Sequence, residues 1–189
     1  MDILRLIEEK RAKESRLLIT IDGPCASGKT TLAQMLADAC RAAVVHTDDF
    51  VIPHAQKTPR RLAIPGGNCD ADRIVKEVAA PWKAGGPVVY RRYDCRADRL
   101  LPPQRLPDAD VLILEGSYCN LPAIRAYAGL RLFMNTPEAL RMERLRRRES
   151  PEALRRFREI WIPLENAYFE AYRLPDAQCV LISGPAAAP

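Results

Sequence analysis

The stretch of sequence that decides the fold is LLITIDGPCASGKT, residues 17–30. Its first part, Leu17 to Ile21, is an apolar run that predicts a buried β-strand. Residues 23–30 then match the pattern G-x-x-x-x-G-K-T, and helical periodicity follows from about Lys29 to Cys40. A phosphate-binding loop needs this order of strand, loop and helix, so a chance Gly/Ser-rich turn is the weaker interpretation.

The loop predicts a binding site for the phosphates of ATP. Its glycines let backbone N–H groups approach phosphate oxygens, and the following helix adds a positive dipole end. In such a loop Lys29 reaches the β- and γ-phosphates, and the Thr30 hydroxyl coordinates Mg²⁺. The thiol of Cys25 could make the site sensitive to oxidants. The ATP-binding residues predicted in the loop are Gly23, Cys25, Ala26, Ser27, Gly28, Lys29, Thr30 and Thr31.

Outward from the loop, apolar runs alternate with helical periodicity over most of the chain. Further strands are predicted at residues 43–46, 88–90, 111–114, 130–134 and 179–182. Further helices are predicted at residues 2–13, at 71–82, from Pro137 onward, and from Pro151 to about Tyr172. This alternation predicts an α/β fold with a mostly parallel sheet and helices on both faces. Together with the phosphate-binding loop, we expect a P-loop NTPase three-layer sandwich with a five-stranded sheet and a small helical lid.

Capping residues, a proline and the spacing of apolar residues give more detailed predictions for three of the helices. Thr136 is predicted as the N-cap of a helix that starts at Pro137, and Ser150 is predicted to cap a second helix of this kind. Pro163 should kink or break the last helix. The apolar stripe of the helix after the loop is expected to consist of Leu32, Met35, Leu36 and Ala39.

Two acidic positions that follow predicted strands are candidates for chemistry at the γ-phosphate. Asp48 comes directly after strand 43–46, where a carboxylate could accept a proton from an attacking hydroxyl or hold the metal through water. Glu115 follows the apolar run 111–114, which is the Walker B arrangement beside Mg²⁺. The alternatives are a solvated turn or helix cap for Asp48 and a polar strand end for Glu115.

A basic run between residues 141 and 148 is the third candidate feature. Arg141, Arg144 and Arg148 fall on one helical face, where guanidinium groups could close over ATP and stabilise charge during phosphoryl transfer. A solvated face paired with the neighbouring glutamates explains any single arginine equally well.

The amino-acid composition excludes several classes of protein. The 189 residues fit one domain, and 48% hydrophobic residues exclude a disordered chain. The net charge of +5 suits a polyanionic partner, but no nucleic-acid recognition motif accompanies it. No signal peptide and no membrane span is expected. The six cysteines include no C-x-x-C pair, so reduced cytoplasmic thiols are expected rather than disulfides or a zinc site.

In this order the motifs resemble the uridine kinase branch of small-molecule P-loop kinases, a group that includes phosphoribulokinase and bacterial pantothenate kinase. The resemblance runs from about residue 17 to residue 182. Thr47-Asp48-Asp49-Phe50 is similar to the family's Asp-x-Phe segment, which implies that Asp48 is the catalytic base. Glu115-Gly116 is similar to the family's Glu-Gly after the central strand.

The resemblance also implies how the acceptor is held. Asn68-Cys69-Asp70 is similar to an Asn-x-Asp whose Asp grips ribose hydroxyls, and Tyr93-Asp94 resembles a Tyr-Asp that lines the substrate pocket. The implied catalytic residues are Asp48, Lys29 and Arg144. The implied metal-binding residues are Thr30, Asp48 and Glu115. The implied acceptor-binding residues are Asp48, Asp70, Tyr93 and Arg141, and Arg141, Arg144 and Arg148 are expected to bind ATP.

The sequence also departs from a pyrimidine nucleoside kinase. Uridine kinases usually carry a histidine a few residues past Tyr-Asp, and residues 95–99 contain none. The Pro59-Arg60-Arg61 segment and the second acid, Asp49, are further departures. Kinase chemistry therefore carries over more safely than the nucleoside acceptor.

The resulting hypothesis is an ATP- and Mg²⁺-dependent kinase acting on a hydroxyl of a small molecule, above all a nucleoside of the uridine or cytidine type. A non-catalytic ATP-binding module is one alternative. A nucleoside monophosphate kinase is another, with basic candidates at Arg60, Arg61, Arg91, Arg92, Arg96 and Arg99. We expect an N-terminal helix at 1–15, a kinase domain at 16–183 with a lid at about 138–158, and a flexible tail at 184–189. No nucleic-acid or membrane partner is expected, and a homo-oligomer is left open.

Overall fold

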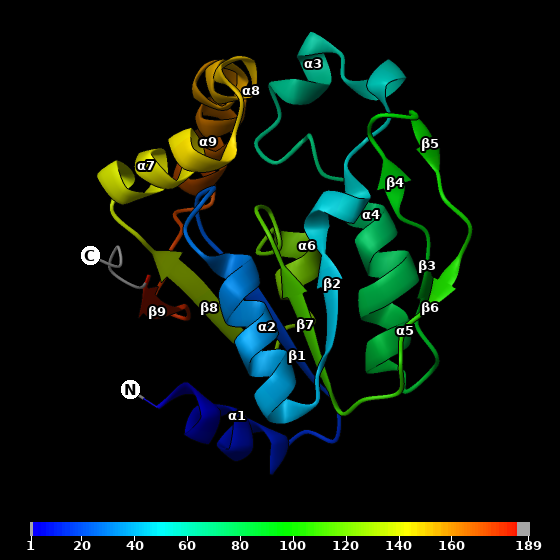
Figure 1. Ribbon diagram of the computed structural model, residues 1–189. Coiled ribbons are helices and arrows are strands. Elements are labelled where there is room, and N and C mark those ends of the chain that lie inside the picture. Colours follow the sequence, from blue (N-terminus) through cyan, green and yellow to red (C-terminus); the bar gives the residue numbers. More distant parts are fainter. Residues whose placement is uncertain (1, 185–189) are drawn as a thin grey trace.

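A five-stranded parallel sheet forms the centre of the computed structural model, which describes residues 2–184 (Figure 1). The strands lie in the order β2-β7-β1-β8-β9, and each neighbouring pair is parallel. Their bounds are Leu17–Asp22 for β1, Ala43–His46 for β2, Val111–Glu115 for β7, Leu130–Asn135 for β8 and Val180–Ser183 for β9. The α/β class and the three-layer P-loop architecture predicted from sequence are confirmed.

Helices cover both faces of this sheet because its strands are apolar on both sides. On one face, α1 (Ile3–Arg11) and α2 (Lys29–Cys40) pack with alternate residues of the strands, among them Ile19. On the other face, Leu18 packs with Tyr168 of α9 (Ile162–Ala171). The helical segments α4 (Ala71–Ile74), α5 (Ala80–Lys83) and α6 (Pro122–Arg125) complete this second layer.

The buried side of α2 differs from the expected stripe. Met35 is 64% exposed and Ala39 is also exposed, whereas Ala33, Leu36 and Ala37 are buried against the sheet. Leu36 was predicted correctly and Leu32 packs at the edge of the buried cluster, but the buried face is rotated away from Met35 and Ala39. The two alanines face the strands and allow a close approach of the helix.

Two helices contain a π-helical turn just before a proline. The predicted helix at 71–82 runs as α4, a π turn at Val75–Ala79 and α5, with Pro81 in its last segment. The last helix runs as α8 (Pro151–Arg156), a π turn at Phe157–Trp161 and α9, with Pro163 near the start of α9. A proline lacks an N–H and crowds the preceding turn, and the wider π turn accommodates both effects.

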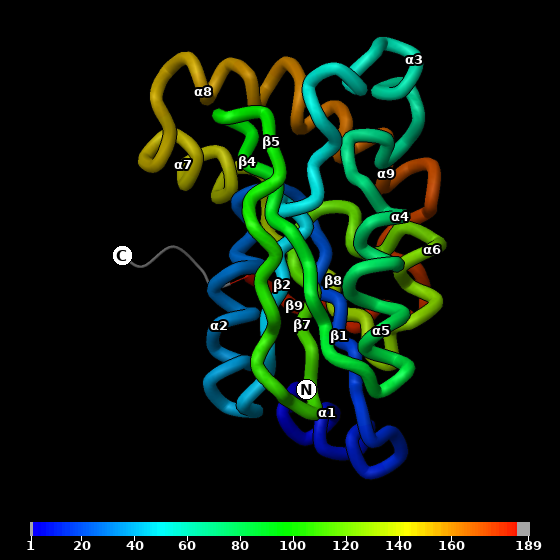
Figure 2. The backbone as a smooth tube through the Cα atoms, turned by 90° about the vertical axis from the view of Figure 1, so that its right-hand side faces the viewer, coloured from blue at the N-terminus to red at the C-terminus, as the bar shows by residue number. Residues whose placement is uncertain are grey.

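The strand predicted at 88–90 lies outside the parallel sheet. Strand β3 (Val89–Tyr90) pairs antiparallel with β6 (Gln104–Arg105), and β4 (Tyr93–Asp94) pairs antiparallel with β5 (Arg99–Leu100). The segment after β2 contains short helical turns. These are η1 (Thr47–Phe50), η2 (His54–Gln56) and α3 (Pro59–Leu62). The turns, the β4–β5 hairpin and α8 gather at one end of the molecule (Figure 2).

The segment proposed as a lid consists of α7 (Glu138–Arg148) and α8. A small apolar cluster joins the two helices to Cys25 of the phosphate-binding loop. Ser150 caps α8 as predicted, accepting from Ala153 N at 3.2 Å. Thr136 does not cap α7: the N-cap is Pro137, and Thr136 Oγ1 donates to Ser27 O at 2.8 Å, which ties β8 to the loop.

Other features of the described residues bear on the sequence predictions. All six cysteines are free, and no helix in residues 2–184 combines the length and apolarity needed to cross a membrane. The predicted tail lies outside the described residues from 185 onward.

Candidate functional site

The parallel topology brings the three predicted motifs to one edge of the sheet. Strand β7 lies between β1 and β2, and Glu115 at its end is in register with both Ile21 and His46. The phosphate-binding loop follows β1, and Asp48 follows β2. Carboxyl ends of adjacent parallel strands form the usual ligand crevice of open α/β sheets. The loop, Asp48 and Glu115 therefore meet although they are far apart in the chain.

Two adjoining cavities open at this edge. One, of about 400 Å³, lies over the loop between Gly28 and the two arginines Arg144 and Arg148. The other, of about 510 Å³, contains Asp48 and extends toward the β4–β5 hairpin and α8. The residues common to both cavities are Ala26, Lys29, Thr30 and Arg148. We call the first the loop cavity and the second the Asp48 cavity.

The loop has the backbone geometry that phosphate binding needs. Gly23 and Gly28 have φ values of +138° and +101°. A Cβ on Gly23 would lie 2.7 Å from Met134 O, so only glycine fits where the loop passes β8. Lys29 Nζ donates to Gly23 O at 2.7 Å and Pro24 O at 3.0 Å, which holds the ammonium group across the loop.

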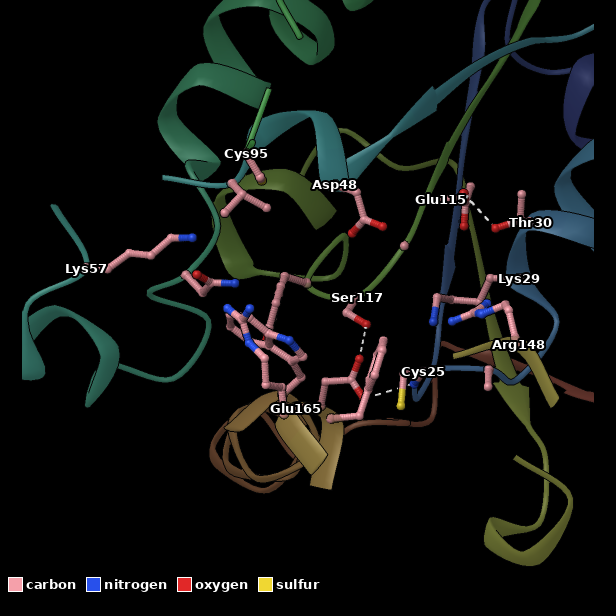
Figure 3. A pocket seen from close by; sticks show the side chains of 18 of the residues that line it. Cys25, Lys29, Thr30, Asp48, Lys57, Cys95, Glu115, Ser117, Arg148 and Glu165 are labelled. Atoms are coloured by element: carbon pink, nitrogen blue, oxygen red, sulfur yellow. Dashed lines mark hydrogen bonds between the residues drawn. The ribbon is translucent and has the colours of Figure 1, made fainter. Parts of the chain in front are cut away.

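Glu115 is positioned from two sides. Its Oε1 accepts from Thr30 Oγ1 at 3.1 Å, as Figure 3 shows, and lies 2.5 Å from His46 Nδ1. The hydrogen bond to Glu115 raises the pKa of His46, although burial of the ring opposes this. The end of β7 is thereby tied to the first residues of α2 and to the end of β2.

The two adjacent acids after β2 have different environments. Asp48 is exposed to the Asp48 cavity; desolvation by the neighbouring wall raises the pKa of its carboxyl, although Lys29 lowers it. Asp49 is buried and accepts from Arg92 Nε at 2.7 Å. The second acid, a departure from the resembled pattern, therefore anchors the segment after β3, and Asp48 is the one that faces the cavity.

The three predicted arginines divide between two roles. Arg144 and Arg148 line the loop cavity, and Arg144 Nη1 donates to Ala26 O at 3.1 Å. Arg141 is buried and lines neither cavity; its guanidinium donates to Thr136 O at 3.2 Å and Cys25 O at 3.4 Å. Arg141 therefore braces the loop from behind, which differs from the expected contact with ATP and acceptor.

Asp70 and Tyr93, the two residues expected to hold the acceptor, have structural partners and do not line the Asp48 cavity. Asp70 caps α4 by accepting from Arg73 N at 3.2 Å. The hydroxyl of the buried Tyr93 is hydrogen-bonded to Asp98 and to His54 N. Asn68 of the first motif and Arg96, two residues after the second, line the cavity instead.

Glu165 is a site residue that sequence analysis missed. It is buried in α9, and its carboxylate accepts from Cys25 N at 2.9 Å and Ser117 Oγ at 2.5 Å (Figure 3). No local sequence motif identifies Glu165, because its contacts depend on the packing of α9 against the phosphate-binding loop. Burial and nearby Glu165 raise the pKa of Cys25 to about 12, so little thiolate forms at neutral pH and the expected sensitivity to oxidants is not supported.

We expect Glu165→Ala to lower the free energy of unfolding by about 1–3 kcal/mol, because the buried N–H of Cys25 loses its acceptor. Urea unfolding followed by circular dichroism measures the change. Glu170→Ala, at an exposed position of the same helix, is the matched control and should stay within about 0.5 kcal/mol of wild type. Equal stability of the two variants would contradict the bracing role of Glu165.

The residues around Thr30 fit a magnesium ion bound together with a nucleotide. Among the described residues no group of three or more His, Cys, Asp or Glu side chains forms an all-protein metal site. The Thr30 hydroxyl next to Glu115, with Asp48 in the same cavity, offers hard oxygen donors. Mg²⁺ prefers such sites, in which few protein oxygens combine with waters and phosphates.

Comparison with known proteins supports the fold. No protein-family model matches the chain. A candidate fructose transport system kinase from Silicibacter sp. TM1040 is 24% identical, with a TM-score of 0.71, over 98% of this chain and 100% of its own. A possible uridine kinase from Bacillus stearothermophilus is 19% identical, with a TM-score of 0.67, over 96% and 100%. A candidate P-loop kinase with a circular permutation from Saccharomyces cerevisiae is 12% identical, with a TM-score of 0.66, over 98% and 100%. The chain has the P-loop kinase fold.

Proposed function

We propose that this protein is an ATP- and Mg²⁺-dependent kinase that transfers the γ-phosphoryl group to a hydroxyl of a small molecule. One observation carries the proposal: Asp48 faces a cavity that adjoins the loop cavity, with Lys29 and Thr30 at their junction. A nucleotide in the loop cavity would present its terminal phosphate to that junction. An acceptor in the Asp48 cavity would then meet both the phosphate and a carboxylate base.

In the proposed reaction Asp48 accepts a hydrogen bond from the acceptor hydroxyl and takes its proton during attack. The acceptor oxygen forms a bond to the γ-phosphorus while the bond from that phosphorus to the β–γ bridging oxygen breaks, which leaves ADP and a phosphate ester. Lys29, Arg144 and Arg148 would spread the charge on the transferred group. Mg²⁺, held by Thr30 with Asp48 or Glu115 directly or through water, would neutralise phosphate charge.

The non-catalytic alternative and the nucleoside acceptor of the main hypothesis are weighed against the same cavity. A non-catalytic ATP-binding module would not need a base, so the opening of Asp48 toward the loop favours an enzyme. A nucleoside acceptor stays a prediction of the motif resemblance, because the residues it relied on, Asp70 and Tyr93, are engaged elsewhere. We therefore define the acceptor by its hydroxyl group.

The test is ADP formation from ATP with a panel of nucleosides, sugars and hydroxy acids. We expect at least one acceptor to raise the rate far above water-dependent hydrolysis. Excess EDTA should return the rate to background and added Mg²⁺ should restore it, because phosphate charge in the loop would otherwise stay uncompensated. ATP binding without ADP formation across the panel would support the non-catalytic module instead.

A further inference from the structure

The Asp48 cavity is lined by cations that do not line the loop cavity. Lys29 and Arg148 line both cavities, but Lys57, Arg96 and Arg156 line the Asp48 cavity alone. None of these last three makes an ion pair with any residue between 2 and 184. We call Lys57, Arg96 and Arg156 the distal cations. Unpaired cations on a concave wall attract and orient an anion.

The distal cations come from three different segments at one end of the molecule. Lys57 follows η2, Arg96 lies in the turn between β4 and β5, and Arg156 ends α8 (Figures 1 and 2). In Figure 3 Asp48 separates Lys57 from the group formed by Lys29, Thr30, Glu115 and Arg148. An acceptor hydroxyl at Asp48 would therefore leave the rest of the molecule directed toward the distal cations.

Carboxylates offset part of this charge, but five cations (Lys29, Lys57, Arg96, Arg148 and Arg156) line the cavity with three carboxylates (Asp48, Glu115 and Glu165), so the lining keeps a positive excess. Glu165, which also lines the cavity, is satisfied by Cys25 N and Ser117 Oγ. Asp98, which does not line the cavity, is hydrogen-bonded to Tyr93 and to His54 N, and its pKa is lowered by these bonds and, to a smaller extent, by nearby Lys57. The ammonium group of Lys57 lies 5.9 Å from the ring centre of Trp161, a cation–π contact at the wall of the cavity.

A second observation points to a ligand on this wall. Asn68 lines the cavity and is 8% exposed, and its Oδ1 has no hydrogen-bond partner among the described residues. An unpartnered buried amide oxygen costs stability unless a donor binds it, so Asn68 Oδ1 fits a hydroxyl or N–H of the ligand, while the distal cations fit its anionic group. Trp161 and Phe157, in the π turn that follows α8, line the same cavity and add an apolar surface. The wall thus combines cations, an amide and aromatic rings.

We propose that the acceptor carries an anionic group, a phosphate or a carboxylate, which the distal cations bind while Asp48 holds its hydroxyl. This inference rests on the proposed kinase function. It defines the substrate class as hydroxylated anions rather than neutral nucleosides or sugars. Charge-assisted hydrogen bonds from three cations would hold the acceptor in one orientation.

Matched pairs of compounds test this class: ribose with ribose 5-phosphate, glycerol with glycerate, and uridine with uridine 5′-monophosphate. Binding is measured by calorimetry on the whole protein saturated with MgADP, which fills the loop and separates binding from turnover. In at least one pair the charged compound should bind about tenfold tighter or more than its neutral partner. If every neutral partner binds as tightly as its charged counterpart, the inference is overturned.

Variants localise the effect. Lys57→Gln and Arg156→Gln should weaken binding of the charged compound about tenfold each and leave that of the neutral partner unchanged. Arg158→Gln, exposed in the same helix and absent from both cavities, is the control and should bind like wild type. Unchanged binding in both cavity variants would overturn the inference. A preference of phosphoryl transfer for neutral acceptors would overturn the inference and leave the kinase function intact. Tight anion binding without any ADP formation would contradict the kinase function alone.

Discussion

Asp48→Asn is expected to lower kcat about 10²–10⁴-fold, because an amide cannot take the proton of the acceptor hydroxyl. The substitution preserves size, and Asp48 opens into the cavity rather than into the core, so the fold should be retained. Initial rates of ADP formation with the best acceptor measure kcat. The affinity for ATP should stay within about threefold of wild type, because a group acting mainly in the transition state changes kcat more than substrate binding.

The neighbouring acid provides the matched control for this experiment. Asp49 is buried and bonded to Arg92, so Asp49→Asn should lower stability but leave kcat within about tenfold of wild type. The pair tests the assignment of roles to two consecutive residues. Near-normal turnover by Asp48→Asn with intact ATP binding would remove Asp48 from the role of base, and a larger loss in Asp49→Asn would transfer that role.

Asp22→Ala is expected to lower the free energy of unfolding by about 3 kcal/mol or more. Asp22 is fully buried at the end of β1, and burial raises its pKa. Its oxygens accept from Gly23 N at 2.7 Å, Asn120 N at 3.0 Å and Tyr168 Oη at 2.7 Å. The alanine variant leaves three buried donors without an acceptor. Each such donor costs about 1–3 kcal/mol.

Urea unfolding at neutral pH measures this loss. Asp38→Ala, exposed on α2, removes a surface hydrogen bond with Gln34 and should change stability by no more than about 0.5 kcal/mol. Asp22→Asn keeps one acceptor oxygen, so its stability should lie between wild type and Asp22→Ala. A loss below about 1 kcal/mol in Asp22→Ala would show that the donors around Asp22 find other partners.

The chain order of motifs was sufficient to predict the sheet and the edge where the site forms. Leu17 to Ile21 and the pattern after it placed β1, the loop and α2, and the bounds of α2 agree with the prediction. These signals are local, because the apolar run, the glycine pattern and the helical periodicity follow one another within residues 17–40. Thr136 and Met35 were misassigned for the opposite reason, because tertiary contacts outweighed local preference.

The sequence by itself determined the P-loop fold and the presence of Lys29, Thr30, Asp48 and Glu115 at a common edge, because parallel strands align their carboxyl ends. Only the tertiary structure decided which neighbours share that edge. In the folded chain Arg141, Asp70 and Tyr93 form hydrogen bonds within the protein and do not line the Asp48 cavity. The tertiary structure also brought Glu165 and the distal cations to the cavity from segments that are distant in the chain. Contacts between segments far apart in sequence leave no periodicity or motif in either segment. Glu165 and the distal cations can therefore be assigned to the cavity only from the folded structure.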